Sequence, residues 1–300
     1  MAFTAKDVQS LREKTGVGMM DCKKALTEAN GDMEKAVELL REKGLAAAAK
    51  KAGRIAAEGV VYSAVEGDVG AVVEVNSETD FVAKNEDFVN FVEAVANTVI
   101  AENPADMDAL MNAKLAGSGE TVQAALQDKI LVIGENLKIR RFERFEGVCA
   151  SYVHGGGRIG VLVQFETDLG EKAEFEAFGK DIAMQIAAVG PRYVGREDVP
   201  AEEVDKEKEI LTIQAMNEGK PQNIAEKMVA GRISKFYKEI CLVDQPFVKN
   251  GDQSVAEYTE ATAKELGGSI KILRFARFEK GEGLEKREDN FADEVASMMK

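Results

Sequence analysis

The spacing of apolar residues in the first part of the chain predicts three short helices separated by glycines. Thr4 and Asp7 have the spacing of a weak capping box before the first helix, and Gly16 ends it. The second helix runs from about 20 to 29, and the third ends at Gly44. Their apolar faces comprise Val8 and Leu11, then Cys22, Ala25, Leu26 and Ala29, then Met33, Ala36, Val37 and Leu40. The three helices together form a compact head, small enough to be marginally stable alone.

The loop Gly16-Val17-Gly18-Met19-Met20 joins the first two helices of this head. Two glycines allow a tight turn, and two adjacent methionines do not both point inward easily. One interpretation is a soft, adaptable docking surface. The other, which the spacing favours, is a tight turn with one methionine in the core. After Gly44 an Ala-rich, helix-prone stretch is interpreted as a linker between the head and the body.

The body of the chain contains one pattern twice. The apolar run Gly70–Val75 predicts a strand that leads into the polar turn Glu78-Thr79-Asp80-Phe81. The turn has a counterpart in Glu166-Thr167-Asp168-Leu169, at an offset of 88 (166 − 78). The following helix repeats at an offset of 87, and the last strand, 137–145, repeats at 270–278. Each half is therefore predicted to be a small antiparallel sheet covered by helices, which is an α+β fold.

The change of offset from 88 to 133 places an insertion of about 45 residues in the second half. It spans roughly 196–244 and turns at Gly219-Lys220-Pro221, which predicts a helical hairpin with arms of about 19 residues. Whether it projects as an antiparallel coiled coil or lies on the body stays open, because its heptads are irregular. The residues expected to face each other are Ile210, Ile213, Met216, Ile224, Met228, Ile233, Tyr237 and Ile240.

A last amphipathic segment carries Phe291, Val295 and Met298 or Met299 on one face. It is interpreted either as a helix packed on its own body or as a docking arm for a partner. The predicted domains are a helical head at 1–45, a linker at 46–58, a first body subdomain at 59–146, a second at 147–195 and 245–280, the inserted hairpin at 196–244 and a C-terminal helical module at 281–300.

Composition narrows the class of protein. The net charge is −14, so the chain lacks the basic excess of a phosphate-binding surface, and nucleic acid is not expected as a direct partner. No apolar run is long enough to cross a membrane, and the N-terminus has no signal-peptide pattern. The three scattered cysteines fit a reducing cytoplasm. One histidine and no paired ligand spacing exclude a structural zinc site.

Candidate chemistry is sparse. Phe81 stands on a loop directly after a carboxylate. An apolar ring at such a place either packs against its own fold or docks in a partner. Glu78 and Asp80 have the types needed for an acid and base pair or a metal site, but no third ligand is near in sequence. His154 precedes three glycines, Gly155–Gly157, that are interpreted as a hairpin turn. A hydrolase would require Glu78, Asp80 and His154 to converge, and no motif indicates this.

Two motifs make the chain resemble bacterial elongation factor Ts over its whole length. One comprises Leu11-Arg12, Thr15-Gly16 and Gly18-Met19-Met20-Asp21-Cys22-Lys23-Lys24-Ala25-Leu26; the other is Glu74-Val-Asn-Ser-Glu-Thr-Asp-Phe-Val-Ala-Lys84. The resemblance implies a guanine-nucleotide exchange factor for the GTPase elongation factor Tu, without a cofactor or covalent chemistry. It also implies a head of the ubiquitin-associated-like (UBA-like) kind, a coiled-coil hairpin and a C-terminal docking helix.

The resemblance assigns roles to particular residues. Thr79, Asp80, Phe81 and Val82 match the segment that members push between two helices of the GTPase, so that Mg²⁺ is displaced and GDP leaves. Gly18, Met19, Met20 and Lys23 of the head, and His154 of the second half, match contacts with the partner. The second copy has Leu169 where the first has Phe81, so no second wedge is expected. A homodimer within a 2:2 complex is left open. The alternative function is an adaptor that binds ubiquitin-like folds without exchange activity, which would rest on the head alone.

Overall fold

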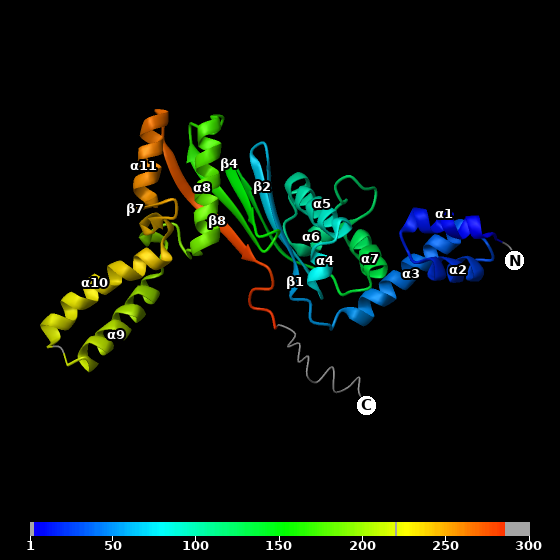
Figure 1. The fold of residues 1–300 in the computed structure, drawn as a ribbon, viewed down its shortest axis with the longest axis horizontal. Coiled ribbons are helices and arrows are strands. Elements are labelled where there is room, and N and C mark those ends of the chain that lie inside the picture. Colours follow the sequence, from blue (N-terminus) through cyan, green and yellow to red (C-terminus); the bar gives the residue numbers. More distant parts are fainter. Residues whose placement is uncertain (1–2, 220, 286–300) are drawn as a thin grey trace.

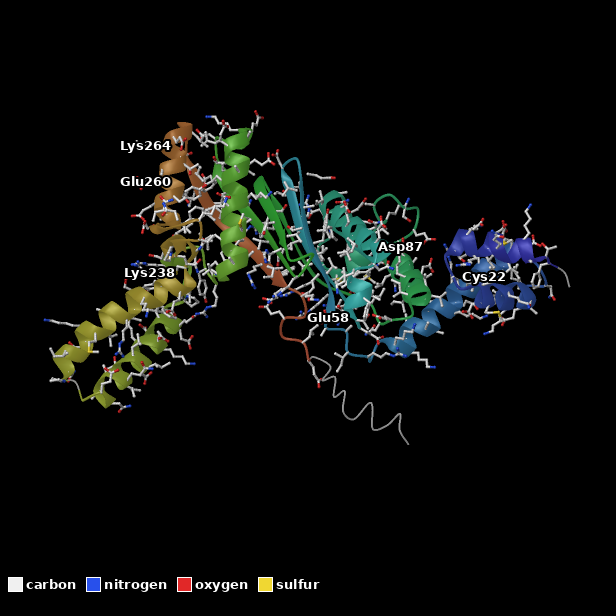
Figure 2. All side chains as sticks on the ribbon, in the orientation of Figure 1. Cys22, Glu58, Asp87, Lys238, Glu260 and Lys264 are labelled. Atoms are coloured by element: carbon white, nitrogen blue, oxygen red, sulfur yellow. The ribbon has the colours of Figure 1, made fainter. Side chains whose placement is uncertain are left out.

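The head is a bundle of three helices at one end of the molecule (Figure 1). The computed structural model describes residues 3–219 and 221–285. The helices are α1 (Ala5–Thr15), α2 (Met19–Glu28) and α3 (Met33–Lys51). The predicted capping box is confirmed: the Thr4 amide donates to the Asp7 carboxylate at 2.7 Å, and the Asp7 amide donates to the Thr4 hydroxyl. Cys22 lies fully buried among the three helices (Figure 2), so these caps and apolar stripes produce the expected core.

The predicted end of the third helix at Gly44 is wrong. α3 continues through the Ala-rich stretch to Lys51 and packs on α7 (Val122–Ile133) of the body. Gly44 is buried, and a Cβ atom there would lie 3.6 Å from the Gln127 carbonyl oxygen. This is an ordinary van der Waals distance, so Gly44 lies inside the helix at its contact with α7 and does not end it. The Lys51 ammonium also donates to the Ile130 carbonyl at 3.2 Å, which joins head and body through one continuous helix.

The body contains two antiparallel sheets of three strands, as the α+β prediction requires. In each sheet the second strand of a hairpin is central and a strand from later in the chain returns beside it. The first sheet comprises β1 (Glu58–Glu66), β2 (Val69–Ser77) and β3 (Lys138–Glu146), and the second comprises β4 (Val148–His154), β5 (Ile159–Thr167) and β8 (Ile270–Glu279).

The two sheets pack face to face between outer layers of helix (Figure 1). α5 (Glu86–Glu102) covers the first sheet with α4 (Asp80–Ala83) and α6 (Met107–Asn112) beside it, and α8 (Ala173–Val189) covers the second. The layer between the sheets contains Val61, Val72, Phe145, Leu162, Ala276 and Phe278. Gly70 and Gly160 make this contact close: a Cβ at Gly70 would lie 2.4 Å from Leu162, and one at Gly160 would lie 2.5 Å from Val61.

The two halves are related by an approximate twofold symmetry that extends to side chains. The Arg141 guanidinium lies over the Phe278 ring at 4.2 Å, and the Arg274 guanidinium lies over the Phe145 ring at 4.1 Å. Arg141 and Arg274 differ by 133 in number, as do Phe145 and Phe278 (274 − 141 and 278 − 145). In each pair the cation belongs to one half of the body and the ring to the other half, so these two cation–π contacts join the sheets.

The insertion forms two antiparallel helices that extend away from the sheets (Figure 1). They are α9 (Ala201–Asn217) and α10 (Gln222–Ile240), reached through short helices at Arg196–Asp198 and Leu242–Asp244. β6 (Pro246–Phe247), β7 (Asn250–Ser254) and α11 (Val255–Leu266) lead back to β8. The hairpin therefore projects, while its assignment as a coiled coil stays a prediction.

The expected packing face of α9 is wrong. Ile210, Ile213 and Met216 are exposed, and the helix packs through a different set of apolar residues, Val204, Leu211 and Ala215. On α10, Ile233 and Ile240 are buried as expected, whereas Ile224 is exposed. α9 carries apolar residues on more than one face, so spacing alone did not select the correct one.

A buried carboxylate anchors the end of the body. Glu74 on β2 is fully buried and receives Arg140 Nη1 at 3.0 Å, Arg141 Nε at 2.6 Å and the Gly281 amide at 2.8 Å. Burial opposes ionisation, but the Gly281 amide, the Asn76 side chain and Arg141 together hold the pKa of Glu74 below its ordinary 4.5. The paired charge therefore joins β2 and β3 to the residues that follow β8.

We predict that Glu74→Ala lowers the free energy of unfolding by about 3–5 kcal/mol, because two arginines lose their buried partner. Since the folded pKa is depressed, the contribution of Glu74 is present above its unfolded pKa of about 4.5 and is lost as pH falls through the folded value. Urea unfolding at pH 7 and at pH 3 checks both statements. If the stability of Glu74→Gln depended on pH as steeply as that of the parent, the statement on the pH dependence would be contradicted.

No helix within residues 3–219 and 221–285 is long and apolar enough to cross a membrane. The amphipathic segment expected around Phe291, Val295 and Met298 lies outside the described residues.

Candidate functional site

The turn after β2 presents an aromatic ring to solvent. Thr79 caps the single-turn helix α4, and its hydroxyl accepts the Val82 amide at 3.5 Å. Ala83 is buried and Val82 packs against the first core, so this side of the turn is fixed to the body. Phe81 points the other way and is 80% exposed. An isolated ring held outward on a supported turn is a feature of a docking element.

Glu135 holds this turn in place. Its carboxylate accepts the Glu78 amide at 3.1 Å, the Thr79 amide at 3.0 Å and the Thr79 hydroxyl at 2.6 Å. Glu135 stands just before β3, more than fifty residues away in sequence, so the sequence analysis did not identify it. The one available signal was its position at the start of the strand that returns beside β2.

The acidic residues of the turn are separated by their partners. Glu78 accepts the Asn136 amide at 2.6 Å and pairs with Arg54 at 3.4 Å. Asp80 points outward and pairs with Lys84 at 2.6 Å; this hydrogen bond, with Lys280 nearby, lowers the pKa of Asp80. The two carboxylates therefore do not form an acid and base pair.

His154 is exposed at the end of β4, and its Nδ1 lies 3.1 Å from the Tyr152 hydroxyl. The hydrogen-bonded partners of Glu78, Asp80 and His154 are all different, so no shared network brings the three together. Within the described ranges no three His, Cys, Asp or Glu side chains are grouped as metal ligands.

The predicted counterpart of the turn in the second half is also wrong. Asp168 accepts the Ser269 amide at 2.8 Å, in the way that Glu78 accepts the Asn136 amide. Asn136 and Ser269 occupy the same place before the returning strand, 133 residues apart (269 − 136). The structural equivalent of Asp168 is therefore Glu78, at an offset of 90, and not Asp80. The sequence alignment matched the two Glu-Thr-Asp motifs at an offset of 88, which is two residues away from the structural equivalence.

The first turn contains residues that the second lacks. Between the end of β2 and Phe88 lie ten residues, 78–87, whereas seven residues, 168–174, separate the end of β5 from Phe175. The additional length carries Asp80 and Phe81. Leu169, which the sequence analysis matched with Phe81, is instead buried in the second core. The exposed ring is thus an addition to the repeated fold.

The β4–β5 hairpin of the second half has a longer loop than the β1–β2 hairpin, and it reaches the same end of the body as the Phe81 turn. Two residues, 67–68, join β1 to β2, whereas four, 155–158, join β4 to β5. The Gly157 carbonyl accepts the Val61 amide at 2.8 Å, and the Arg158 carbonyl accepts the Lys280 amide at 2.9 Å. These bonds place the His154 hairpin against β1, near the end of the sheet where the Phe81 turn begins.

The head offers a separate apolar surface. Gly18 caps α2, and Lys23 is exposed on the same helix. Met19 is 42% exposed and Met20 is 63% exposed, so the expectation that one methionine enters the core is wrong. A hollow of about 480 Å³ beside Met19 is lined by Phe3, Thr4, Ala5, Val8, Gln9 and Lys23. The soft docking surface, the other interpretation of this loop, is the one that agrees with this exposure.

An exposed ring and exposed methionines carried on a rigid, duplicated scaffold are typical of the class of proteins that bind other proteins. Residues 78–282 match the family model described as Elongation factor TS. The chain is 56% identical to Elongation factor Ts of Clostridium perfringens (strain ATCC 13124), with 99% of both chains covered. It is 53% identical to the protein of that name from Clostridium botulinum (strain Eklund 17B), and 52% identical to that of Trichlorobacter lovleyi. The chain therefore belongs to the elongation factor Ts family.

We predict that Glu135→Ala loosens the turn without unfolding the body. A hydrogen bond to a charged group contributes about 1.5–3 kcal/mol, so the Glu78 and Thr79 amides should exchange with solvent about 10- to 100-fold faster. Hydrogen exchange measured by NMR checks this, with Glu143→Ala, an exposed carboxylate on β3, as the control. Unchanged exchange at Glu78 and Thr79 would show that Glu135 does not hold the turn.

Proposed function

We propose that this chain is a guanine-nucleotide exchange factor that acts on elongation factor Tu and promotes the release of GDP. Membership of the elongation factor Ts family supports this role. The observation that carries the mechanism is the exposure of Phe81 on a turn that three hydrogen bonds to Glu135 hold in place. An apolar ring in water favours transfer into a partner's pocket, and a held turn loses little entropy when it docks.

The proposed mechanism is a wedge. The turn Thr79-Asp80-Phe81-Val82 docks between two helices of the GTPase, with Phe81 as the inserted group and with Thr79 and Val82, which are fixed to the body, as its support. Asp80 contacts the displaced surface as a carboxylate, since its pKa lies below the ordinary value. The partner's Mg²⁺ then loses its position, and uncompensated phosphate charge weakens the binding of GDP.

Thermodynamic linkage connects the two binding events. If the chain binds the nucleotide-free GTPase more tightly than the GDP-bound form, it must weaken GDP binding by the same factor. The chain needs no chemistry of its own for this effect, because it only shifts the population of partner states. The head surface around Met19 and Met20 and the hairpin at His154 supply the additional contacts that hold the partner while the turn inserts.

We expect Phe81→Ala to slow chain-stimulated GDP release about 30-fold, which is the effect of losing a central contact of about 2 kcal/mol. Because the ring is exposed, the free energy of unfolding should change by less than about 0.5 kcal/mol. Stopped-flow release of a labelled GDP from purified elongation factor Tu measures the rate. Ile213→Ala, which truncates an exposed apolar side chain on α9, is the matched control. GDP release at the parental rate in Phe81→Ala would contradict the wedge mechanism.

We also expect Met20→Glu to weaken binding of the nucleotide-free GTPase about tenfold, because it places a charge in the apolar contact of the head. Isothermal titration calorimetry in EDTA measures this affinity. GDP release at saturating concentration of the variant should stay near the parental rate, since the turn is unchanged. Equal affinities of the variant and the parent would remove the head from the proposed interface.

A further inference from the structure

The outer edge of β4 has no hydrogen-bonded neighbour. Among the described strands, β4 pairs only with β5, along its whole length. Within residues 3–219 and 221–285, the backbone groups of residues 148–153 make no hydrogen bond outside this β4–β5 ladder. Alternate residues of an antiparallel strand direct their N–H and C=O groups away from the paired strand. The outer side of β4 is therefore a row of free backbone donors and acceptors.

The repeat identifies which residues of β4 face outward. In the first half the Val61 amide donates to the Gly157 carbonyl at 2.8 Å, so the backbone of Val61 is directed away from β2. Cys149 lies 88 residues later (149 − 61), at the same place in the register of its own hairpin. Cys149, Ser151 and Val153 therefore present their backbone groups at the free edge.

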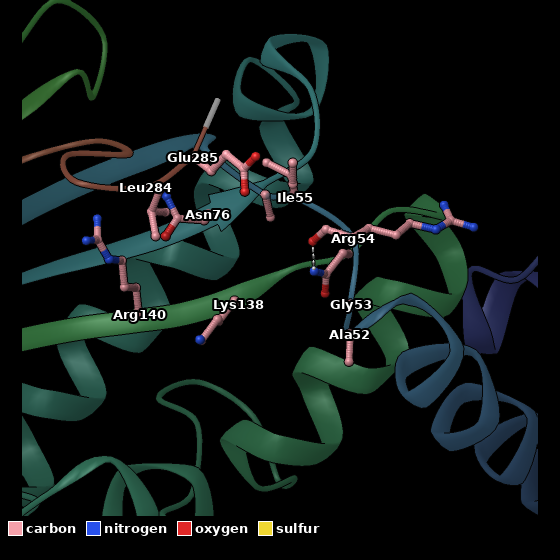
Figure 3. A pocket seen from close by; sticks show the side chains of 11 residues that line it. Ala52, Gly53, Arg54, Ile55, Asn76, Lys138, Arg140, Leu284 and Glu285 are labelled. Atoms are coloured by element: carbon pink, nitrogen blue, oxygen red, sulfur yellow. Dashed lines mark hydrogen bonds between the residues drawn. The ribbon is translucent and has the colours of Figure 1, made fainter. Parts of the chain in front are cut away.

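The other edge strands of the two sheets are covered or charged. The His154 hairpin takes the Val61 amide of β1, and the connector before β1 is fixed where the Arg54 carbonyl accepts the Asn136 side-chain amide at 2.8 Å (Figure 3). β3 and β8 carry charged side chains along their length, namely Lys138, Arg140, Arg141, Glu143, Arg144 and Glu146, and Lys271, Arg274, Arg277 and Glu279. The sequence of β4, Val-Cys-Ala-Ser-Tyr-Val-His, has no lysine, arginine, carboxylate or proline. Such residues commonly keep an edge strand from pairing, so β4 lacks the protection of the others.

A groove of about 620 Å³ runs along this edge, between β4 and α8 (Figure 1). It is lined by residues 148–151 of β4, by the face of α8 that carries Glu176 and Lys180, and by Val65 and Gly67 of the first hairpin. The lining segment of β4 is about 10 Å long, and that of α8, roughly two helical turns, is about 11 Å long. The groove therefore has room for about four residues of extended chain beside β4.

The α8 wall carries two opposite charges along the groove. Glu176 and Lys180 are both exposed and lie one helical turn apart, about 5.4 Å. Lys172, on the same wall, is instead bound to the Leu266 carbonyl at 2.6 Å. Residues i and i+2 of an extended strand are about 6.6 Å apart and point to the same face. A strand in the groove can therefore set a basic side chain against Glu176 and an acidic one against Lys180.

We propose that this groove docks an extended peptide segment of another protein, which adds to the second sheet as a strand beside β4. Main-chain hydrogen bonds to the free edge supply the affinity. A basic and an acidic residue two positions apart supply the specificity, with an apolar residue between them that faces Val65. β2 separates the groove from the Phe81 turn by about 27 Å, so both surfaces can be occupied at once. This inference goes beyond the proposed exchange function and does not rest on it.

The probe is the synthetic peptide acetyl-Thr-Val-Lys-Val-Glu-Val-Thr-amide, titrated into the isotopically labelled full-length chain and followed by NMR. We expect saturable shifts of the Cys149, Ser151 and Val153 amides and slower hydrogen exchange there, because these amides gain carbonyl partners. Two further peptides carry N-methyl groups at alternate residues, in the two possible phases. One phase should abolish binding and the other should leave it nearly unchanged, since only alternate amides of an added strand face β4.

Charge reversal tests the α8 wall without altering the strand. The double variant Glu176→Lys, Lys180→Glu should bind the original peptide about tenfold more weakly, because both ion pairs become repulsive. It should bind a peptide with lysine and glutamate exchanged as well as the parent binds the original. Lys264→Glu, an exposed site on α11, is the control and should change neither affinity.

Ser151→Pro tests the strand edge itself. Proline is tolerated on an edge strand where the N–H faces outward, so the variant should keep its circular dichroism spectrum and lose the peptide. The charge-reversal variant keeps the proposal testable if the proline disturbs β4.

The proposal would be overturned if neither peptide shifted the edge amides at up to about 1 mM. Equal loss of binding in both N-methyl phases would exclude strand addition, and binding that charge reversal does not redirect would place the peptide outside the groove. Concentration-dependent dimerisation in sedimentation that Ser151→Pro abolishes would show that a second copy of the chain occupies the edge instead.

Discussion

The face-to-face packing of the two sheets is the contact on which the rest of this structure depends. Neither three-stranded sheet is large enough to bury both of its faces alone, and each therefore uses the other as a cover. Gly70 and Gly160 let the sheets approach closely, and the reciprocal stacking of Arg141 on Phe278 and Arg274 on Phe145 seals the edge of the contact. The helices are left to the outer faces, and the loops at the sheet ends are free for other roles.

The candidate functional elements occupy the places where the two halves differ in length. The first half has three extra residues after β2, which carry the exposed ring of Phe81. The second half has a longer hairpin beside His154 and the inserted helices α9 and α10. Loops at the ends of a rigid scaffold accept such additions at low cost in stability, because the ladder and the core remain intact. The duplicated parts form the frame, and the parts that differ in length carry the candidate functional surfaces.

Short-range sequence patterns predicted the helices and strands well, but they predicted poorly which distant residues these helices and strands contact. The capping box at Thr4, the strand Gly70–Val75 and the returning strands all follow from short-range pattern. Gly44 failed as a helix end because α3 continues through it and packs on α7, a long-range contact that no local signal reveals. The face of α9 was mistaken because it has more than one apolar stripe. The clamp by Glu135 joins residues that are distant in sequence, so pattern within one element could not indicate it.

The sequence by itself determined the α+β class, the duplicated body, the inserted hairpin and the resemblance to one family, since these rest on periodicity, repeats and motifs. It also identified Phe81 as an odd residue at a strand end. Only the tertiary structure decided that the ring is exposed, that Glu78 rather than Asp80 corresponds to Asp168, and that both methionines of the head face solvent. The physical reason is that burial and hydrogen-bond partners depend on which distant surfaces meet, and repeated letters do not encode the register of a sheet.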